Sequence, residues 1–151
     1  MDDNLRELYQ EIILDHSRHP RHFGALGAAN HVAEGHNPLC GDRVKVYLQV
    51  DDKGRIADVS FEGRGCAISV ASASLMTDML KGRTIEDAEK LMGGFLDMVK
   101  GENAGGLNGD DRELLEVMAG VSAFPMRVKC ATLAWHAMKA ALDNEGAART
   151  E

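Results

Sequence analysis

Three cysteines and one aspartate are the residues of this sequence whose types and positions could support chemistry. The cysteines are Cys40, Cys66 and Cys130, an odd number that argues against a disulfide-stapled fold. Asp42 lies two residues beyond Cys40, and Gly41 between them supplies the backbone freedom for a turn that aims sulfur and carboxylate at one ion. Three thiolates and a carboxylate complete a tetrahedral ligand set. Such a set suits Zn²⁺, and thiolates also hold iron–sulfur clusters.

Simpler interpretations of these residues remain open at this stage. A free cysteine is often a buried small hydrophobic residue, and the chain has no Cys-x-x-Cys pair to mark a metal site. Asp42 has the alternative role of an ordinary turn carboxylate. Arg127 and Lys129 flank Cys130 and would offset the negative charge of a thiolate site, or they are solvated charges in a first helical turn.

The elements that must position these residues follow from hydropathy patterning and turn residues. They are a helix that stops before Pro20, an irregular segment over 19–39, strands over 44–50 and 56–61, helices over 68–79 and 84–99, a loop over 101–109, a short helix capped by Asp110–Asp111 and a last helix after Pro125. Thr84 and Asp87 resemble a capping arrangement, and Gly93–Gly94 are expected to interrupt the helix that follows.

The order of these elements predicts an α+β fold, with a small antiparallel β-sheet packed against several helices in a single domain over residues 1–151. We expect the tail from about residue 143 to be disordered. Cys66 falls at a helix start and Cys130 in the first turn of the last helix, where free N–H groups and the helix dipole favour a thiolate. Such junctions converge readily at one end of a sheet.

Charge and composition exclude several classes of function. The chain of 151 residues has 17 Lys and Arg against 24 Asp and Glu, a formal net charge of −7 that disfavours nucleic-acid binding. No apolar stretch approaches the ~18 residues that a membrane span requires, and the N-terminal residues are acidic, so we expect a cytoplasmic protein. The histidines from His16 to His31 fit no single helix face, and we interpret them as surface or partner contacts.

Three segments together carry a resemblance to a known family. They are Asn37–Asp42, Phe61–Ser69 with Ala71–Ser74, and Arg127–Trp135. In this order they resemble the IscU/NifU-N family of iron–sulfur cluster assembly proteins, most closely its SufU branch, and the likeness reaches to about Leu142. Lys129 departs from the His of IscU proteins, and Phe124–Lys129 replaces their Pro-Pro-Val-Lys chaperone motif.

The resemblance implies a SufE/IscU-like fold in which Cys40, Asp42, Cys66 and Cys130 bind one metal. It implies a zinc-dependent sulfurtransferase that takes persulfide sulfur onto Cys40 from a SufS-type, pyridoxal-phosphate cysteine desulfurase, with Arg127 contacting that partner. The alternative is a scaffold that builds a [2Fe–2S] cluster on the same residues and passes it to other Suf proteins or to apo iron–sulfur proteins. A third interpretation makes zinc a structural ion of an interaction module, although a carboxylate beside three cysteines is unusual there.

Overall fold

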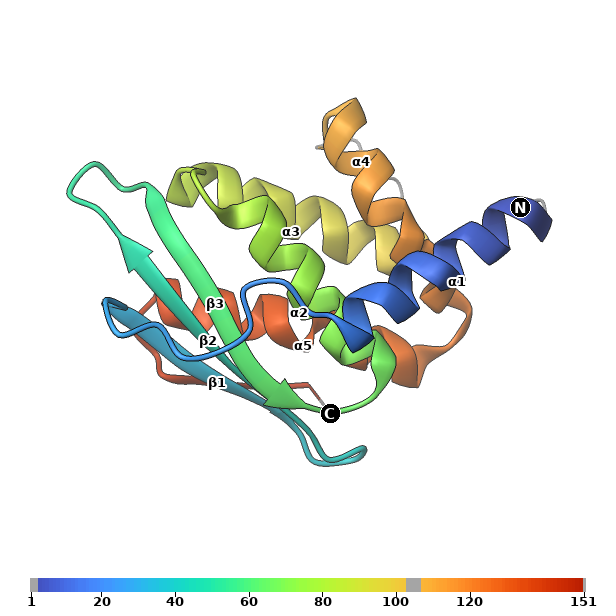
Figure 1. The fold of residues 1–151 in the computed structure, drawn as a ribbon, viewed down its shortest axis with the longest axis horizontal. Coiled ribbons are helices and arrows are strands. Elements are labelled where there is room, and N and C mark those ends of the chain that lie inside the picture. The colour runs from blue at the N-terminus through green and yellow to red at the C-terminus, as the bar shows by residue number, and fades with distance from the viewer. Residues whose placement is uncertain (1–2, 103–106, 151) are drawn as a thin grey trace.

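A computed structural model of the chain describes residues 3–102 and 107–150, and it has the predicted α+β architecture. Figure 1 shows a sheet on one side of the molecule and the longer helices gathered on the other. The elements are α1 (Asp3–Arg18), β1 (His31–Asn37), β2 (Asp42–Val50), β3 (Ile56–Arg64), α2 (Ala67–Leu80), α3 (Ile85–Val99), α4 (Gly109–Leu115), the 3₁₀ helix η1 (Glu116–Ala123), α5 (Pro125–Leu142) and β4 (Ala147–Arg149).

The sheet has four strands in the order β3-β2-β1-β4, of which β4 runs parallel to β1 and the others pair antiparallel. It is therefore mixed, not antiparallel throughout as expected. The prediction of an irregular segment over 19–39 is wrong for His31–Asn37, which form β1. The tail from about residue 143, which we expected to be disordered, contains strand β4. The buried positions of β1 are Ala33, Gly35 and Asn37, and a side chain at Gly35 would meet Leu133 and Ala137 of α5 at 3.1–3.2 Å. Packing against a distant helix, and not hydropathy, thus specifies this strand.

The hairpin of β2 and β3 places the chemistry-bearing residues at one end of the sheet. Both strands were predicted, and β3 continues beyond the expected end to Arg64. Arg43 pairs with Arg64 across the two strands, so the residues just before β2 and just after β3 share that end. The turn at the opposite end uses Gly54 with φ +76°, a left-handed conformation that favours glycine.

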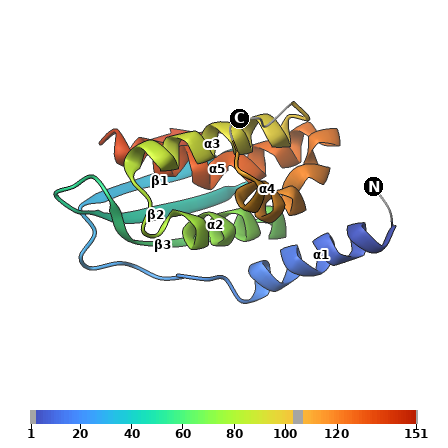
Figure 2. The same ribbon diagram turned by 90° about the horizontal axis from the view of Figure 1, so that it is seen from above.

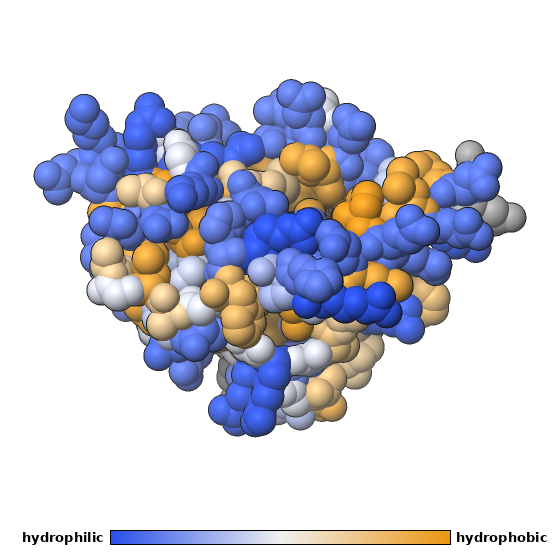
Figure 3. Space-filling view, viewed as in Figure 1, coloured by the Kyte–Doolittle hydropathy of each residue, from blue (hydrophilic) through white to orange (hydrophobic). Residues whose placement is uncertain are grey.

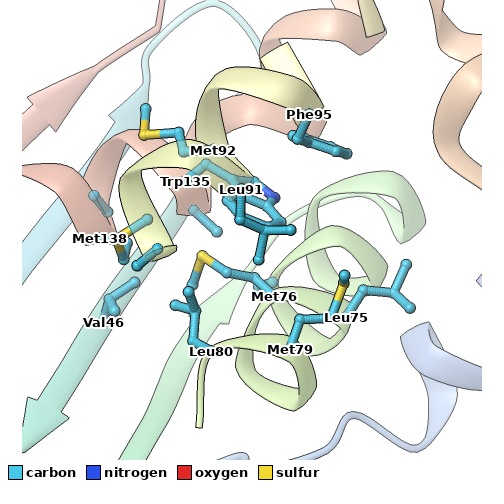
Figure 4. Packing of buried hydrophobic residues seen from close by; sticks show 14 of the residues in the cluster. Val46, Leu75, Met76, Met79, Leu80, Leu91, Met92, Phe95, Trp135 and Met138 are labelled. Atoms are coloured by element: carbon cyan, nitrogen blue, oxygen red, sulfur yellow. The ribbon is translucent and has the colours of Figure 1, made fainter. Parts of the chain in front are cut away.

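The core lies between the sheet and the helices α2, α3 and α5. Figure 4 shows Met138 of α5 next to Val46 of β2, and Met76, Leu91 and Trp135 from the three helices close together in the same cluster. Trp135 is fully buried and stacks on Phe95 with ring centroids 4.7 Å apart. Several methionines fill the remaining space, because their flexible thioether side chains adapt to irregular gaps. In Figure 2, α1 lies outside α2, on the side away from α3.

The structure tests two predicted helix caps and the predicted interruption of one helix. Thr84 accepts the backbone N–H of Asp87, as predicted, but α4 is capped by Asn108 instead of Asp110–Asp111. Helix α3 continues through Gly93–Gly94 without interruption. Gly94 is needed for packing, since a Cβ there would lie 2.4 Å from the side chain of Leu107. Part of the predicted loop, residues 103–106, lies outside the described residues.

The surface of the molecule mixes polar and apolar regions. Figure 3 shows apolar surface beside the end of α1, on which Leu5, Leu8 and Leu14 are exposed. Among the described residues, none of the helices combines the length and apolar composition that a bilayer crossing needs.

Candidate metal centre

Asp42 lies at the centre of the candidate site and is almost completely buried. Asp42 is the first residue of β2 and is only 2% exposed. Its Oδ1 accepts the backbone N–H of Cys66 at 3.1 Å. The thiol of Cys66 donates a weaker hydrogen bond to Oδ2 at 3.8 Å. Cys66 is the N-cap of α2 and makes no side-chain cap of its own. The carboxylate of Asp42 therefore ties the start of β2 to the start of α2.

Cys40 lies in the turn between β1 and β2 and is exposed. The carbonyl oxygen of Asn37 accepts the N–H of Gly41 at 2.9 Å, and its side-chain Oδ1 accepts the N–H of Leu39 at 3.1 Å. Gly41 has φ +74°, so the backbone freedom expected at this position is used. The turn presents the Cys40 thiol at the surface while its base remains fixed by hydrogen bonds.

Cys130 is the buried member of the site. It lies in the second turn of α5, which begins at Pro125, and not in the first turn as predicted, so free N–H groups of the helix start are not beside it. Its Sγ is 3.6 Å from Sγ of Cys40. Burial raises the pKa of the Cys130 thiol well above its usual range, and hydrogen bonds with Asp42 and Cys40 raise it further. Without a cation, this thiol is protonated.

The structure brings Cys40, Asp42 and Cys130 together, with one ligand atom of each residue within 4.8 Å of the others. Cys66 is not one of these clustered residues, and it contacts the group only through its hydrogen bonds to Asp42. Two sulfurs, a carboxylate and a third thiol nearby fit a thiophilic divalent cation such as Zn²⁺, and the buried, protonated Cys130 is a ligand that such a cation would ionise. The donor chemistry of Cys40, Asp42 and Cys130 therefore fits a metal, with Cys66 held beside Asp42 by hydrogen bonds.

Four cationic residues lie on the segments next to the three cysteines. Arg43, Arg64, Arg127 and Lys129 have no ion-pair partner in the part of the chain that the structure describes. Arg127 lies in the first turn of α5, exposed, with its guanidinium 4.9 Å from the centre of the Phe124 ring. It is not among the clustered ligand residues. The charges of these four residues are therefore not used in ion pairs and are available to a partner.

Sequence reasoning gave no role to two residues that hold the site together. Asn37 closes the Cys40 turn, and only its place before Pro38 hinted at a turn. Thr150 follows β4: its N–H donates to the carbonyl oxygen of His36 at 3.2 Å, and its hydroxyl donates to that of Lys129 at 3.2 Å. It thus links β1 to α5, next to Cys130. No local pattern in the expected tail indicated this contact.

Comparison with known proteins places this arrangement in a family. Residues 8–93, which include Cys40, Asp42 and Cys66, match the family model of the NifU-like N-terminal domain. A relative from Bacillus subtilis, named zinc-dependent sulfurtransferase SufU, is 41% identical over 142 residues, which cover 94% of each chain. A Streptococcus pyogenes protein, named iron–sulfur cluster assembly scaffold protein IscU, is 41% identical over 140 residues, covering 91% of this chain and 84% of that protein.

Solved structures agree with the fold. A crystal structure from Fervidobacterium islandicum, titled as a putative iron–sulfur cluster assembly scaffold protein for the SUF system, superposes with a TM-score of 0.77 at 35% identity. The match covers 93% of this chain and 99% of that one. The resemblance drawn from the three motif segments is thereby confirmed over nearly the whole chain.

Proposed function

The chain belongs to the family of NifU-like N-terminal domains, and we propose that it acts in iron–sulfur cluster assembly as a zinc-dependent sulfur acceptor. In this proposal Cys40 takes persulfide sulfur from a SufS-type cysteine desulfurase. Cys40, Asp42, Cys66 and Cys130 hold the zinc, and Arg127 contacts the desulfurase. Because the proposed chemistry needs reduced thiols, the proposal includes a cytoplasmic location.

One observation carries the proposal: an exposed Cys40 lies 3.6 Å, sulfur to sulfur, from a buried Cys130. A sulfur acceptor must be reachable by the donor, and Cys40 lies in an exposed turn. Cys130 lies behind it, where a donor cannot reach. The same pair of thiols, with Asp42, is suited to hold a cation that keeps the acceptor from stray oxidation.

The transfer step is a thiol exchange that needs no external oxidant or reductant. The Cys40 thiolate attacks the terminal sulfur of the donor persulfide, a new S–S bond forms on Cys40, and the donor's own S–S bond breaks. The desulfurase cysteine leaves as a thiolate. Bound zinc would supply ionisation of the thiols and a fixed ligand geometry. The unpaired cations around the site favour both the attacking and the leaving thiolate.

A second candidate function is a scaffold that assembles a [2Fe–2S] cluster and passes it to other Suf proteins or apo iron–sulfur proteins. It draws support from the relative named IscU and uses the same four residues. We favour the sulfur acceptor because Lys129 precedes Cys130 where IscU proteins have a further potential ligand, a histidine. An oxygen ligand such as Asp42 also suits zinc retention.

Analysis of zinc, iron and acid-labile sulfide in anaerobically purified protein separates the two functions. A sulfur acceptor contains about one zinc and no sulfide, and it accelerates desulfurase turnover in a manner lost in Cys40→Ala. Equal amounts of iron and sulfide, with cluster transfer to an apo-ferredoxin, would identify the scaffold instead. Arg127→Glu serves as the partner-contact variant: we expect weaker stimulation with unchanged zinc content, because Arg127 lies outside the ligand cluster.

A further inference from the structure

Asn37 is fully buried, yet one atom of its side-chain amide has no hydrogen-bond partner. Its exposure is 0%, and its Nδ2 is one of two buried side-chain polar atoms left unpaired among the described residues. The other is Oγ of Ser60 on β3. An unpaired buried donor destabilises a fold, so each one in a native structure needs a physical explanation.

The orientation of this amide is fixed by the Cys40 turn. Oδ1 of Asn37 accepts the N–H of Leu39 at 3.1 Å. If the amide oxygen and nitrogen of Asn37 were exchanged, its NH₂ group would face the N–H of Leu39, and two donors would be in contact. The hydrogen bond from Leu39 therefore assigns Nδ2 as the atom without a partner. Because Asn37 also accepts from Gly41 through its main chain, the unpaired N–H group lies at the base of the turn that carries Cys40.

The groups around this turn change their hydrogen-bonding character when the site is loaded. Asn37 pairs in register with Asp42 across β1 and β2, so the two buried residues are direct neighbours at the end of the sheet where Cys40 lies. Without a cation, the Cys40 and Cys130 thiols form a hydrogen bond with each other. A cation that ionises a thiol removes its donor proton, and the metal-bound sulfur, now negatively charged, accepts hydrogen bonds more strongly than the thiol did. Groups that donate to metal ligands in this way fix the ligands and tune affinity.

We propose that Asn37 is a positioning residue whose Nδ2–H group donates to the Cys40 thiolate when a soft divalent cation occupies the site. This rests on the metal-binding part of the proposed function and is independent of sulfur transfer. The unpaired donor of the metal-free protein is then satisfied on binding, which adds to metal affinity. Asn37 holds the turn through Oδ1 in both states.

Two substitutions and a matched control separate the donor from the turn. Asn37→Ser keeps a side-chain oxygen that can accept the N–H of Leu39, but it removes the amide donor. Asn37→Ala removes both groups. Ser60→Ala is the control, because it removes the other unpaired buried polar atom at a position paired with Tyr47, away from the ligand end of the sheet.

The experiment measures Zn²⁺ affinity by competition with a chromophoric chelator, and the sulfur-to-metal charge-transfer absorption of the Co²⁺ form. We expect Asn37→Ser to weaken Zn²⁺ binding about 10- to 100-fold, as outer groups of metal sites typically do, and to shift the Co²⁺ band. Ser60→Ala should change neither. Wild-type affinity together with a wild-type Co²⁺ spectrum in Asn37→Ser would overturn the proposal.

A measurement on the unsubstituted protein keeps the proposal testable if the Asn37 variants fail to fold. The Asn37 side-chain amide protons should move downfield in the NMR spectrum when Zn²⁺ binds, as an N–H group does on gaining an acceptor. Unchanged shifts in protein that has bound Zn²⁺ would overturn the proposal. If the chain binds no Zn²⁺ at all, the zinc-dependent function fails with it, whereas Zn²⁺ binding without sulfur transfer contradicts only that function.

Discussion

The backbone N–H of Cys66 donates to the buried carboxylate of Asp42 at 3.1 Å, so two candidate metal ligands from different elements hold each other in place. Asp42 opens β2 and Cys66 caps α2. Half of the proposed ligand set is thus positioned before any cation arrives, and such preorganisation reduces the cost of assembling the site. Cys40 and Cys130 complete it from a turn and a helix.

Gly65 gives a way to disturb this pair without removing a ligand. A Cβ at position 65 would lie 2.5 Å from Oδ1 of Asp42, so Gly65→Ala must displace the carboxylate. We expect Zn²⁺ affinity to fall by about tenfold or more, measured by chelator competition. Gly93→Ala is the control, since a Cβ there meets nothing within 4 Å inside α3. It should leave the affinity unchanged and raise stability by about 1 kcal/mol. Equal affinities in both variants would contradict the placement of Asp42.

Zinc should protect the cysteines from alkylation. In metal-free protein, iodoacetamide should modify the exposed Cys40 and Cys66 well before the buried Cys130. One equivalent of Zn²⁺ should slow modification of all three, and Asp42→Ala should weaken this protection. Peptide mapping by mass spectrometry gives the rate at each position. If zinc protected Cys130 alone, Cys40 and Cys66 would not be ligands.

Ser72 of α2 forms two hydrogen bonds to α5, the helix that carries Cys130. The indole N–H of the fully buried Trp135 donates to Oγ of Ser72 at 3.1 Å, and the Ser72 hydroxyl donates to the carbonyl oxygen of Ala131 at 2.5 Å. Ser72→Ala leaves the indole donor unpaired, and we expect a loss of about 1–3 kcal/mol in urea unfolding. In a Trp135→Phe background the same change should cost clearly less. Additive losses would show that the hydrogen bond contributes nothing.

Stability should decline as the pH falls below neutrality. Burial lowers the pKa of His16, and the Arg21 guanidinium lowers it further, while burial also lowers the pKa of His136. Between the ordinary pKa of about 6.5 and the lower native values, the unfolded chain binds more protons than the native one, so the free energy of unfolding decreases as pH drops.

Urea unfolding of metal-free protein from about pH 7.5 to about pH 5.5 measures this decline across the ordinary histidine pKa. His16→Gln should flatten the decline, because one of the two shifted groups is removed. A slope identical to that of the unsubstituted protein would assign the effect to other residues.

Local signals predicted the elements that depend on local sequence. Apolar spacing predicted α1 and the central part of α2, alternation predicted β2, and Thr84 was recognised as a cap because its partner is only three residues away. The ligand set followed from residue type, because few side chains bind soft metals. The hairpin of β2 and β3 and the start of α2 were both visible in the sequence, and they bring Asp42 and Cys66 together. Cys130 meets Cys40 and Asp42 through the packing of α5, which the sequence did not indicate.

Long-range contacts account for what the sequence did not predict. Strand β1 has small and polar residues whose buried positions face α5, almost a hundred positions along the chain. His16 was interpreted as a surface residue but is buried, with Nδ1 2.8 Å from Oγ of Ser74. The contacts of Thr150 and the burial of Asn37 likewise depend on tertiary structure.

The proposed role of Cys40 is tested most directly by locating transferred sulfur. The zinc-loaded protein is incubated with a SufS-type desulfurase and cysteine, alkylated to trap persulfides, and mapped by peptide mass spectrometry. The proposal predicts one additional sulfur atom on the Cys40 peptide, none on the Cys66 and Cys130 peptides, and no sulfur on any peptide in Cys40→Ala. Sulfur first found on Cys66 or Cys130, or undiminished labelling in Cys40→Ala, would contradict it.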